Sequence, residues 1–569
     1  MKRLGLMGLI LWLSLAASAQ TPESSPVVPE PRVGSLAGRI VTDDRQPLAK
    51  VRVQINRLGV KQAEMVNAKT DAEGAFVANG LAAGAYSVSA SMPGYVTANG
   101  FSANEYHRLG SSVNITLTKG GVITGRVEDE TGSALVKVNV KALRLRTLQG
   151  ASVVAADFDS RSTTTDDRGV YRLYGLAPGF YHVAITPGAN WPNRNQLTTY
   201  HPSASRPLAT EVAVPAGGEI AGIDIRLRKQ LGVTVSGTAS GQAETGMMSG
   251  SYVQLFNLAT QTWEDYADIK PNQPFAIHGV ADGDYELHAV SQNYGGEEAG
   301  YTAIAKPVRV SVRGADVTGI AVRMLPVGSI KGRVVLEKTE KPASEAPNCP
   351  ATTSLIFESV VSALTEGAPK RNPWGNVDAP NEQGQFRLRG LEAGTYHLQF
   401  DWPAPHWYVR TIAGLTATVP AAGKVLPAAN DQFMLKPGQA LDNVIVTVAA
   451  NAARLQGRVV AASAAKLPAR LRVHLIPVDA TQAEELLRYD EVITQGDGLF
   501  QFDHIAPGKY WLLAQAVPAN EPLETQRRLQ AWDSVTRKQL RQAAARAGKE
   551  ISLTACQRLA DISLSVSAP

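Results

Sequence analysis

Cysteine is nearly absent from this chain of 569 residues, which contains only Cys349 and Cys556. A framework of several disulfides is therefore excluded, and stability must come from apolar cores. The apolar fraction of 44% is enough for packed cores, which excludes a wholly disordered chain. The two thiols could pair in an oxidising compartment, provided that their Cα atoms come within about 7 Å of each other.

A strong excess of one charge is also missing. Lys and Arg number 56 against 51 for Asp and Glu, and the small difference is spread along the chain. This balance gives no indication of nucleic-acid binding. Beyond the N-terminal region, no apolar run reaches the ~20 residues that a membrane-spanning helix needs. We therefore expect no nucleic-acid partner and no membrane span in the mature chain.

The N-terminal residues carry the pattern of a signal peptide. Lys2 and Arg3 precede an apolar run from Leu4 to Ala17, and Ala17-Ser18-Ala19 has the small-x-small form of a cleavage site. A membrane anchor is the alternative, but the run is shorter than a spanning helix. The pattern predicts a signal peptide over residues 1–19, a Pro-rich linker over 20–32, and export to the periplasm, the cell surface or the medium.

Motifs of common enzymes are missing as well. None of the nine histidines begins a His-x-x-Glu or His-Glu-x-x-His motif, which a zinc peptidase would need. Nucleophile-elbow, P-loop and Cys-x-x-Cys motifs do not occur either. His182, His397 and His474 stand at polar positions of alternating strands, which indicates solvated side chains. We expect no catalytic residue, no metal site and no cofactor, and hence a protein that is not an enzyme.

The chain does contain a short segment that recurs five times and ends in Gly-x-Tyr. Gly with small residues or Pro predicts a tight turn, and the Tyr then begins a strand of alternating polarity. The Tyr ring can bury a large apolar area while its hydroxyl binds the backbone. The five tyrosines are Tyr86, Tyr181, Tyr285, Tyr396 and Tyr510, spaced 95, 104, 111 and 114 residues apart. These spacings are domain lengths, too long for solenoid repeats.

Further signals accompany each copy. Upstream of the turn, four copies carry an Asp or Asn turn that ends in Gly and an aromatic residue, which is typical of a hairpin; the third copy keeps only the aromatic residue. Each copy also opens on a strand containing Gly, in most cases Gly-Arg, and closes on a strand of clean alternation. Short alternating strands between turn signals, within about 100 residues, predict a β-sandwich.

The repeats predict an all-β chain of tandem immunoglobulin-like or transthyretin-like β-sandwich domains with one C-terminal amphipathic helix. We expect module 1 at residues 33–119, module 2 at 120–229, a divergent module 3 at 230–326, module 4 at 327–450 and module 5 at 451–569. The helix is expected over about 524–547, with Leu529, Trp532, Leu540 and Ala543 on one stripe and Gly548 as its stop. It would pack across the last sandwich or, alternatively, bind a partner.

The combined pattern of Gly-Arg-Val, an Asp-Gly turn and Gly-x-Tyr resembles the carboxypeptidase regulatory-like domain. That domain is a transthyretin-like sandwich related to carbohydrate-binding-like and Cna-B-type folds. The resemblance covers modules 1, 2, 4 and 5 well and module 3 weakly, and the run Leu197-Thr-Thr-Tyr200-His201-Pro202 is similar to exported bacterial members with several modules. It implies the fold rather than a function, because such domains are accessories in many contexts.

Three functions remain open. The first is a non-catalytic, exported scaffold or adhesion protein of the cell envelope that binds proteins. The second is polysaccharide binding through loop aromatics, which are Trp191, Trp374, Trp402, Trp407 and Tyr408. These rings could instead cover core edges or fill joints between modules. The third is an enzyme with an unrecognised site, which would need titratable groups converging in a pocket. We favour the scaffold, with a protein or a polysaccharide of the cell envelope as its partner.

Overall fold

The computed structural model describes residues 33–59, 65–97, 105–148, 151–154, 160–186, 194–241, 249–260, 262–270, 273–294, 300–337, 355–365, 376–414, 430–461, 467–494, 497–518, 521 and 529–566. Residues 1–32, with the expected signal peptide and linker, lie outside this set, as do Trp191, Trp374 and Cys349. Strands dominate the described residues, and α1 (Ser534–Ala547) is their only α-helix. The predicted all-β class with one C-terminal helix is confirmed.

The first two modules follow each other directly, because a single residue separates the last strand of module 1 from the first strand of module 2. Module 1 contains β1 (Val33–Val41), β2 (Arg52–Arg57), β3 (Met65–Lys69), β4 (Ala75–Ala82), β5 (Tyr86–Ser91), β6 (Tyr95–Thr97) and β7 (Ser112–Lys119). Module 2 contains β8 (Gly121–Glu128), β9 (Asn139–Leu148), β10 (Ala151–Val154), β11 (Arg161–Thr164), β12 (Val170–Leu176), β13 (Gly179–Thr186), β14 (Thr199–Tyr200), β15 (Val212–Val214), β16 (Glu219–Ile220) and β17 (Ile225–Arg226).

In the described residues, the third and fourth modules contain eight strands each. Module 3 contains β18 (Val233–Ser240), β19 (Ser249–Asn257), β20 (Thr262–Asp268), β21 (Pro274–Val280), β22 (Gly283–Asn293), β23 (Gly300–Ala305), β24 (Val308–Val312) and β25 (Val317–Pro326). Module 4 contains β26 (Gly328–Leu336), β27 (Val360–Thr365), β28 (Val377–Asp378), β29 (Gln385–Leu391), β30 (Gly394–Asp401), β31 (Tyr408–Ala413), β32 (Gln432–Leu435) and β33 (Ala440–Ala449).

The fifth module adds the helix to the same sandwich. It contains β34 (Ala453–Ala461), β35 (Leu471–Pro477), β36 (Asp490–Thr494), β37 (Leu499–Ile505), β38 (Gly508–Ala516), α1, β39 (Lys549–Leu553) and β40 (Arg558–Val566), with short 3-10 helices at Ala480–Gln482, Leu486–Arg488 and Gln530–Trp532. Its two sheets run in the order β37-β34-β40 and β36-β35-β38-β39. The buried residues of each of the five main core clusters come from a single module, so every sandwich has its own apolar core.

The opening strand of each module has neighbours on both sides. It lies antiparallel to the strand that precedes the Gly-x-Tyr turn, and parallel to the closing strand, as β1 does with β4 and β7. In module 2 two short strands, β16 and β17, take the parallel position beside β8. A glycine makes the parallel approach possible: a Cβ atom on Gly38 would lie 2.0 Å from the carbonyl oxygen of Val113, and one on Gly237 would lie 2.0 Å from that of Ile320. The opening Gly is therefore required because any side chain would separate the two strands.

The repeated tyrosine has the role that the sequence predicts. Each ring is buried, and each hydroxyl donates a hydrogen bond to the carbonyl oxygen of the residue four positions earlier. The oxygen–oxygen distance is 2.7 Å for Tyr181 and Tyr510 and 3.0 Å for Tyr285 and Tyr396. This bond closes the Gly turn over the start of the strand, so the hydroxyl is satisfied while the ring fills the core.

The predicted Asp turns are present, but the prediction that they close hairpins is wrong, because each turn connects strands of different sheets: β3 pairs with β2, whereas β4 pairs with β1. Asp71 Oδ1 accepts hydrogen bonds from the backbone N–H groups of Glu73 (3.1 Å) and Ala75 (2.8 Å), and Gly74 has a φ of +72°. Asp166 and Asn381 bind their own turns in the same way. These side-chain oxygens stabilise the backbone of the turn, which is the usual use of Asp and Asn at such positions.

The helix is shorter than predicted. It begins at Ser534 rather than near residue 524, because Asp533 stops the preceding 3-10 turn and accepts the N–H of Thr536 as an N-cap. Its buried face contains Arg537, Leu540 and Ala544, of which only Leu540 belongs to the expected stripe. Gly548 ends the helix as expected, and the helix packs on β35 and β38 of module 5.

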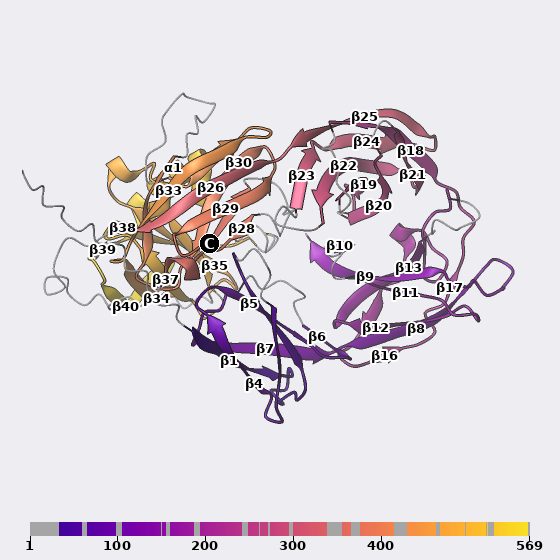
Figure 1. The fold of residues 1–569 in the computed structure, drawn as a ribbon, viewed down its shortest axis with the longest axis horizontal. Coiled ribbons are helices and arrows are strands. Elements are labelled where there is room, and N and C mark those ends of the chain that lie inside the picture. The colour runs from indigo at the N-terminus through magenta and orange to yellow at the C-terminus, as the bar shows by residue number, and fades with distance from the viewer. Residues whose placement is uncertain are drawn as a thin grey trace, which may run out of the picture.

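The modules do not form a straight rod. Figure 1 shows a curved chain in which module 1, at the indigo end, returns to the neighbourhood of module 4. Arg108 makes the contact: its Nε donates to the carbonyl oxygen of Glu358 (3.0 Å), and Nη2 binds both the carbonyl oxygen (3.2 Å) and the carboxylate of Asp401. Beside it, a Cβ on Gly59 would lie 2.3 Å from the carbonyl oxygen of Ala379. Modules 1 to 4 therefore close into a ring.

Candidate functional site

A pocket opens at the joint between modules 4 and 5. Its volume is about 340 Å³, and its lining residues are Tyr408, Val409, Arg410, Asn451, Leu487, Arg488, Ala506, Pro507 and Ala555. β31 supplies the first three of these residues, while the turn before β38 supplies Ala506 and Pro507. The two modules therefore build the pocket together, and its two charged lining residues are both arginines.

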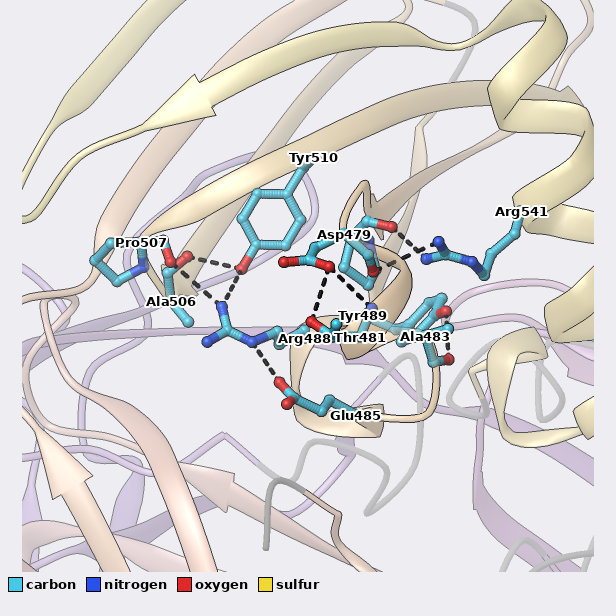
Figure 2. Close-up of polar contacts among 11 residues, drawn as sticks. Asp479, Thr481, Ala483, Glu485, Arg488, Tyr489, Ala506, Pro507, Tyr510 and Arg541 are labelled. Atoms are coloured by element: carbon cyan, nitrogen blue, oxygen red, sulfur yellow. Dashed lines mark hydrogen bonds and ion pairs between the residues drawn. The ribbon is translucent and has the colours of Figure 1, made fainter. Parts of the chain in front are cut away.

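Arg488 is held in place by three groups of module 5. Figure 2 shows its guanidinium between Glu485 on one side and Pro507 and Tyr510 on the other. Nε binds the Glu485 carboxylate at 2.7 Å, while Nη1 lies 3.3 Å from the carbonyl oxygen of Pro507 and 3.4 Å from the Tyr510 hydroxyl. Burial raises the pKa of Tyr510, although the Arg488 charge opposes the shift. The phenol thus stays protonated and donates to Ala506.

The other arginine enters from module 4. Arg410 Nε pairs with Glu337 at 3.1 Å, and its Nη2 lies 3.5 Å from the hydroxyl of Tyr408. Asn451 Oδ1, also in the lining, has no hydrogen-bond partner among the described residues. Two guanidinium groups can hold a short peptide segment or a small acid through hydrogen bonds. The lining residues of this pocket include no carboxylate and no histidine.

A buried ion network lies on the face of the β36-β35-β38-β39 sheet that points away from the core of module 5. Glu491 lies 3.2 Å from Arg472 and 3.2 Å from Nδ1 of His474, and all three side chains are nearly inaccessible to solvent. Glu521 also pairs with Arg472. The interpretation of His474 as a solvated residue is therefore wrong. The strand alternation predicted a polar face correctly, but the segment around α1 covers that face.

The same covering segment reaches module 4. Trp532 stacks on His397 with ring centroids 3.8 Å apart and an interplanar angle of 5°. His397 is fully buried, and its Nδ1 lies 3.1 Å from the Asp431 carboxylate, so its predicted solvation is wrong as well. Close by, the backbone oxygen of Trp407 in module 4 and Nδ1 of His504 in module 5 lie 2.8 Å apart. The joint is therefore a packed interface rather than a flexible hinge.

Asp490, at the start of β36, makes the stability of module 5 sensitive to pH. Burial raises its pKa to about 7, and the neighbouring Glu491 and Asp503 charges add to the shift. An unfolded Asp titrates near pH ~3.9. Between these two values the folded state binds more protons than the unfolded state, so stability falls as pH rises through this window.

Replacing Asp490 with Asn should remove that loss. The amide keeps an oxygen for the Glu491 N–H, which binds Asp490 Oδ1 at 2.8 Å. We expect D490N to melt at a higher temperature than the parent chain at pH 8, with the difference disappearing near pH 4. The control is D129N. Hydrogen bonds lower the pKa of Asp129, an exposed turn residue, so this variant should melt at a lower temperature than the parent chain at pH 8. An equal gain for D490N at both pH values would contradict this assignment.

Comparisons with known proteins bear on the fold of the modules. Residues 35–118 match the family model of the carboxypeptidase regulatory-like domain. The matched residues lie within module 1 and confirm the resemblance there. The search of curated proteins found no match.

Solved structures to which this chain is similar include two pilins and one further bacterial protein. The TIE protein of Bacillus anthracis is 9% identical, with 79% of this chain and 74% of that chain covered and a TM-score of 0.15. The minor pilin GBS52 of Streptococcus agalactiae is 15% identical, with 37% and 100% covered and a TM-score of 0.20. The shaft pilin SpaA of Lactobacillus rhamnosus is 13% identical, with 35% and 100% covered and a TM-score of 0.18. At such values we take no functional argument from these likenesses.

The aromatic residues proposed for glycan contact are placed as follows. Trp407 is fully buried in the core of module 4, and Trp402 is 8% exposed and packs beside it. Tyr408 is also 8% exposed but lines the joint pocket. Trp191 and Trp374 lie outside the described residues. Of the five predicted contact residues, the structure therefore places one in a pocket, beside Arg410 and Arg488, which no sequence motif singles out.

The described residues contain no group of three or more His, Cys, Asp or Glu side chains arranged to hold a metal ion. Within the same residues, no helix has both the length and the apolar character needed to cross a membrane.

Proposed function

We propose that this protein is an exported, non-catalytic scaffold of the cell envelope, in which regulatory-like sandwich modules hold protein-binding surfaces in fixed positions. The observation that carries the proposal is the closure of module 1 onto module 4 through Arg108. A chain of independent enzyme domains has no need of such a contact, whereas a scaffold does, because fixed geometry lowers the entropic cost of binding several points at once.

Contacts at the joints between modules 2 and 3, 3 and 4, and 4 and 5 support a fixed arrangement. Arg206 of module 2 pairs with Glu264 of module 3 at 2.8 Å and donates to Thr262 at 2.6 Å. β23 of module 3 contacts β29 of module 4, and modules 4 and 5 share the packed interface at His397 and Trp532. The joint pocket, with its two arginines, is the surface best suited to a peptide segment of a partner.

Export and partner binding can be tested in one experiment. The full chain with a C-terminal tag is produced in a bacterial host that processes signal peptides, and the cell is fractionated. We expect an extracytoplasmic product that begins at Gln20. A photo-crosslinking residue at Leu487, in the joint pocket, should then link the protein to one envelope protein, while the same residue at exposed Leu208 should not. Retention in the cytoplasm with Met1 intact would overturn the exported scaffold.

A disulfide between modules 4 and 5 is part of the same proposal. Cys556 is disulfide-bonded, and Cys349, which lies outside the described residues, is the other cysteine of the sequence. We expect exported protein to yield a Cys349–Cys556 peptide pair in non-reducing mass spectrometry. Reduction should lower the melting temperature of the joint, because a cross-link typically stabilises by about 2–4 kcal/mol. Two free thiols in the exported protein would contradict the bond.

Polysaccharide binding through loop aromatics stays a second candidate. Trp191 and Trp374 are the members of that set whose exposure is not described, and Tyr408 is the one that borders a pocket. Retention of the folded chain on cell-wall polysaccharide, lost on replacing Trp191 and Trp374 with Ala, would support this candidate.

A further inference from the structure

A second and larger cavity lies where module 1 meets module 2. Its volume is about 630 Å³, within the usual range for ligand sites. Five basic side chains line it and no acidic one does: these are Lys50, Arg52, Lys69, Arg144 and Arg161. Such a concentration departs from the chain as a whole, in which 56 basic residues face 51 acidic ones.

The first wall places like charges directly opposite each other. Arg52 of β2 is paired in register with Lys69 of β3, and Ser91 of β5 lies on the other side of Arg52. Like charges at directly opposed positions of an antiparallel pair destabilise the sheet. Lys50, two residues before Arg52, has a φ of +62°, in the region that few residues other than Gly adopt. The opposed charges and the backbone conformation of Lys50 thus lower the stability of this end of the sheet.

The second wall comes from module 2. Arg161 at the start of β11 is paired with Ala142 of β9, and Arg144 lies two residues further along β9, opposite Tyr181. Arg144 also donates to the carbonyl oxygen of Pro178 at 3.1 Å. The two arginines therefore stand at diagonal positions on one face of the sheet. The cavity brings them to the same space as the three basic residues of module 1.

Neighbouring carboxylates do not neutralise this charge. Within the part of the chain that the structure describes, Lys50, Arg52, Lys69 and Arg161 form no ion pair. Cations gathered in a concave site raise the local potential more than the same charges on a convex surface. An anionic ligand would relieve the repulsion, so the cavity fits a molecule with several negative charges.

The remaining lining indicates the kind of anion. Met92, Pro93 and half-buried Tyr95 form an apolar strip, and Ser91 and Thr97 add hydroxyl groups beside it. Sugar rings have apolar C–H faces that pack on such surfaces and hydroxyl groups that bind polar side chains. We propose that this cavity, the basic cleft, binds an acidic polysaccharide whose sugar rings carry carboxylate groups. This activity goes beyond the proposed scaffold function.

A nucleic acid fits the basic cleft less well. Proteins that bind single strands stack successive bases on a series of aromatic side chains, whereas this cleft contains Tyr95 and Tyr181, and the ring of Tyr181 is buried in the core of module 2. Duplex binding relies on an extended basic surface rather than on a cavity between two domains. Carboxylates on a sugar chain need only the point charges and the short apolar strip that the cleft offers.

The test measures binding of the full chain to polygalacturonate, with its methyl ester as a ligand that has the same sugar backbone but no charge. The variant K50Q/R52Q/K69Q removes three charges from one wall. The matched control, R39Q/R333Q/R458Q, removes three arginines from exposed positions of the opening strands in modules 1, 4 and 5. Calorimetry at several salt concentrations gives both affinity and the number of ionic contacts.

We expect binding of polygalacturonate that weakens with salt and a loss of roughly tenfold or more in affinity for the cleft variant. The control should bind polygalacturonate like the parent chain, and the methyl ester should bind neither to the control nor to the parent chain. The cleft variant should also melt no lower than the parent, because it loses the Arg52–Lys69 repulsion. If it melts at a lower temperature, the affinity for polygalacturonate is measured on the single variant K69Q instead. Unchanged affinity in a folded variant overturns the proposal, as does equal binding of the ester or tighter binding of DNA. None of these outcomes depends on export or on the joint pocket.

Discussion

Replacing Trp407 with Ala should destabilise module 4 by about 3–5 kcal/mol, the usual cost of removing a large aromatic side chain from a core. Trp407 has no exposed surface, and its ring lies 6.1 Å from that of Trp402, which in turn stacks on Phe400 at 5.0 Å. The backbone oxygen of Trp407 also lies within hydrogen-bond distance of His504 in module 5. We therefore expect the loss to spread from the core of module 4 to its joint with module 5.

Hydrogen exchange measured by mass spectrometry locates this effect within the full chain. Peptides from β30, β31 and β33 should exchange faster in W407A, while peptides from modules 1 and 2 should not change. The control is Y174A, which removes an aromatic ring that is 67% exposed and should alter stability by no more than about 0.5 kcal/mol. Unchanged protection in module 4 would mean that Trp407 does not support the core.

This result also decides how glycan binding can be tested. A Trp402 and Trp407 double variant loses two buried rings of one core, so a loss of polysaccharide retention would report unfolding rather than a missing contact. The basic cleft avoids the difficulty, because Lys50, Arg52 and Lys69 are exposed and their removal leaves the core of module 1 intact.

Local features of the modules were predictable from the sequence. The Gly-x-Tyr turns and the Asp turns depend on contacts within four residues, so their chemistry is present in the motif itself. The strand alternation around Tyr181 likewise predicts which residues face the core. The parallel pairing of opening and closing strands was not predictable. β1 and β7 lie far apart in the sequence, and no turn connects them directly, so their pairing depends on the fold of the whole module.

Features that depend on contacts between distant segments were missed. His397 and His474 occupy the polar side of their strands, but Trp532 and Glu491 cover them after folding. A strand pattern distinguishes two faces but does not show whether a later segment packs on the polar one. The basic cleft was missed for the same reason. Its charges are separated by up to 111 residues in the sequence, from Lys50 to Arg161, and an overall charge balance conceals them.

Replacing Arg108 with Glu should open the ring that modules 1 to 4 form. The guanidinium makes hydrogen bonds to the carbonyl oxygens of Glu358 and Asp401 and an ion pair with the Asp401 carboxylate, and the side chain is 19% exposed. Hydrogen bonds to charged groups contribute about 1.5–3 kcal/mol each, so their loss should raise the open fraction roughly tenfold or more. The carboxylate of Glu would in addition face that of Asp401 and repel it.

Small-angle X-ray scattering of the full chain measures the opening as an increase in both radius of gyration and maximum dimension. The matched control is R172E, because Arg172 pairs with Glu219 inside module 2 and both side chains are about half exposed. That exchange changes the net charge by the same amount and should leave the scattering curve unchanged. The double variant R108E/D401R restores opposite charges across the contact and should recover part of the compact form. If R108E scatters like the parent chain, Arg108 does not close the ring, and the fixed arrangement that supports the scaffold proposal would have to rest on the other joints alone.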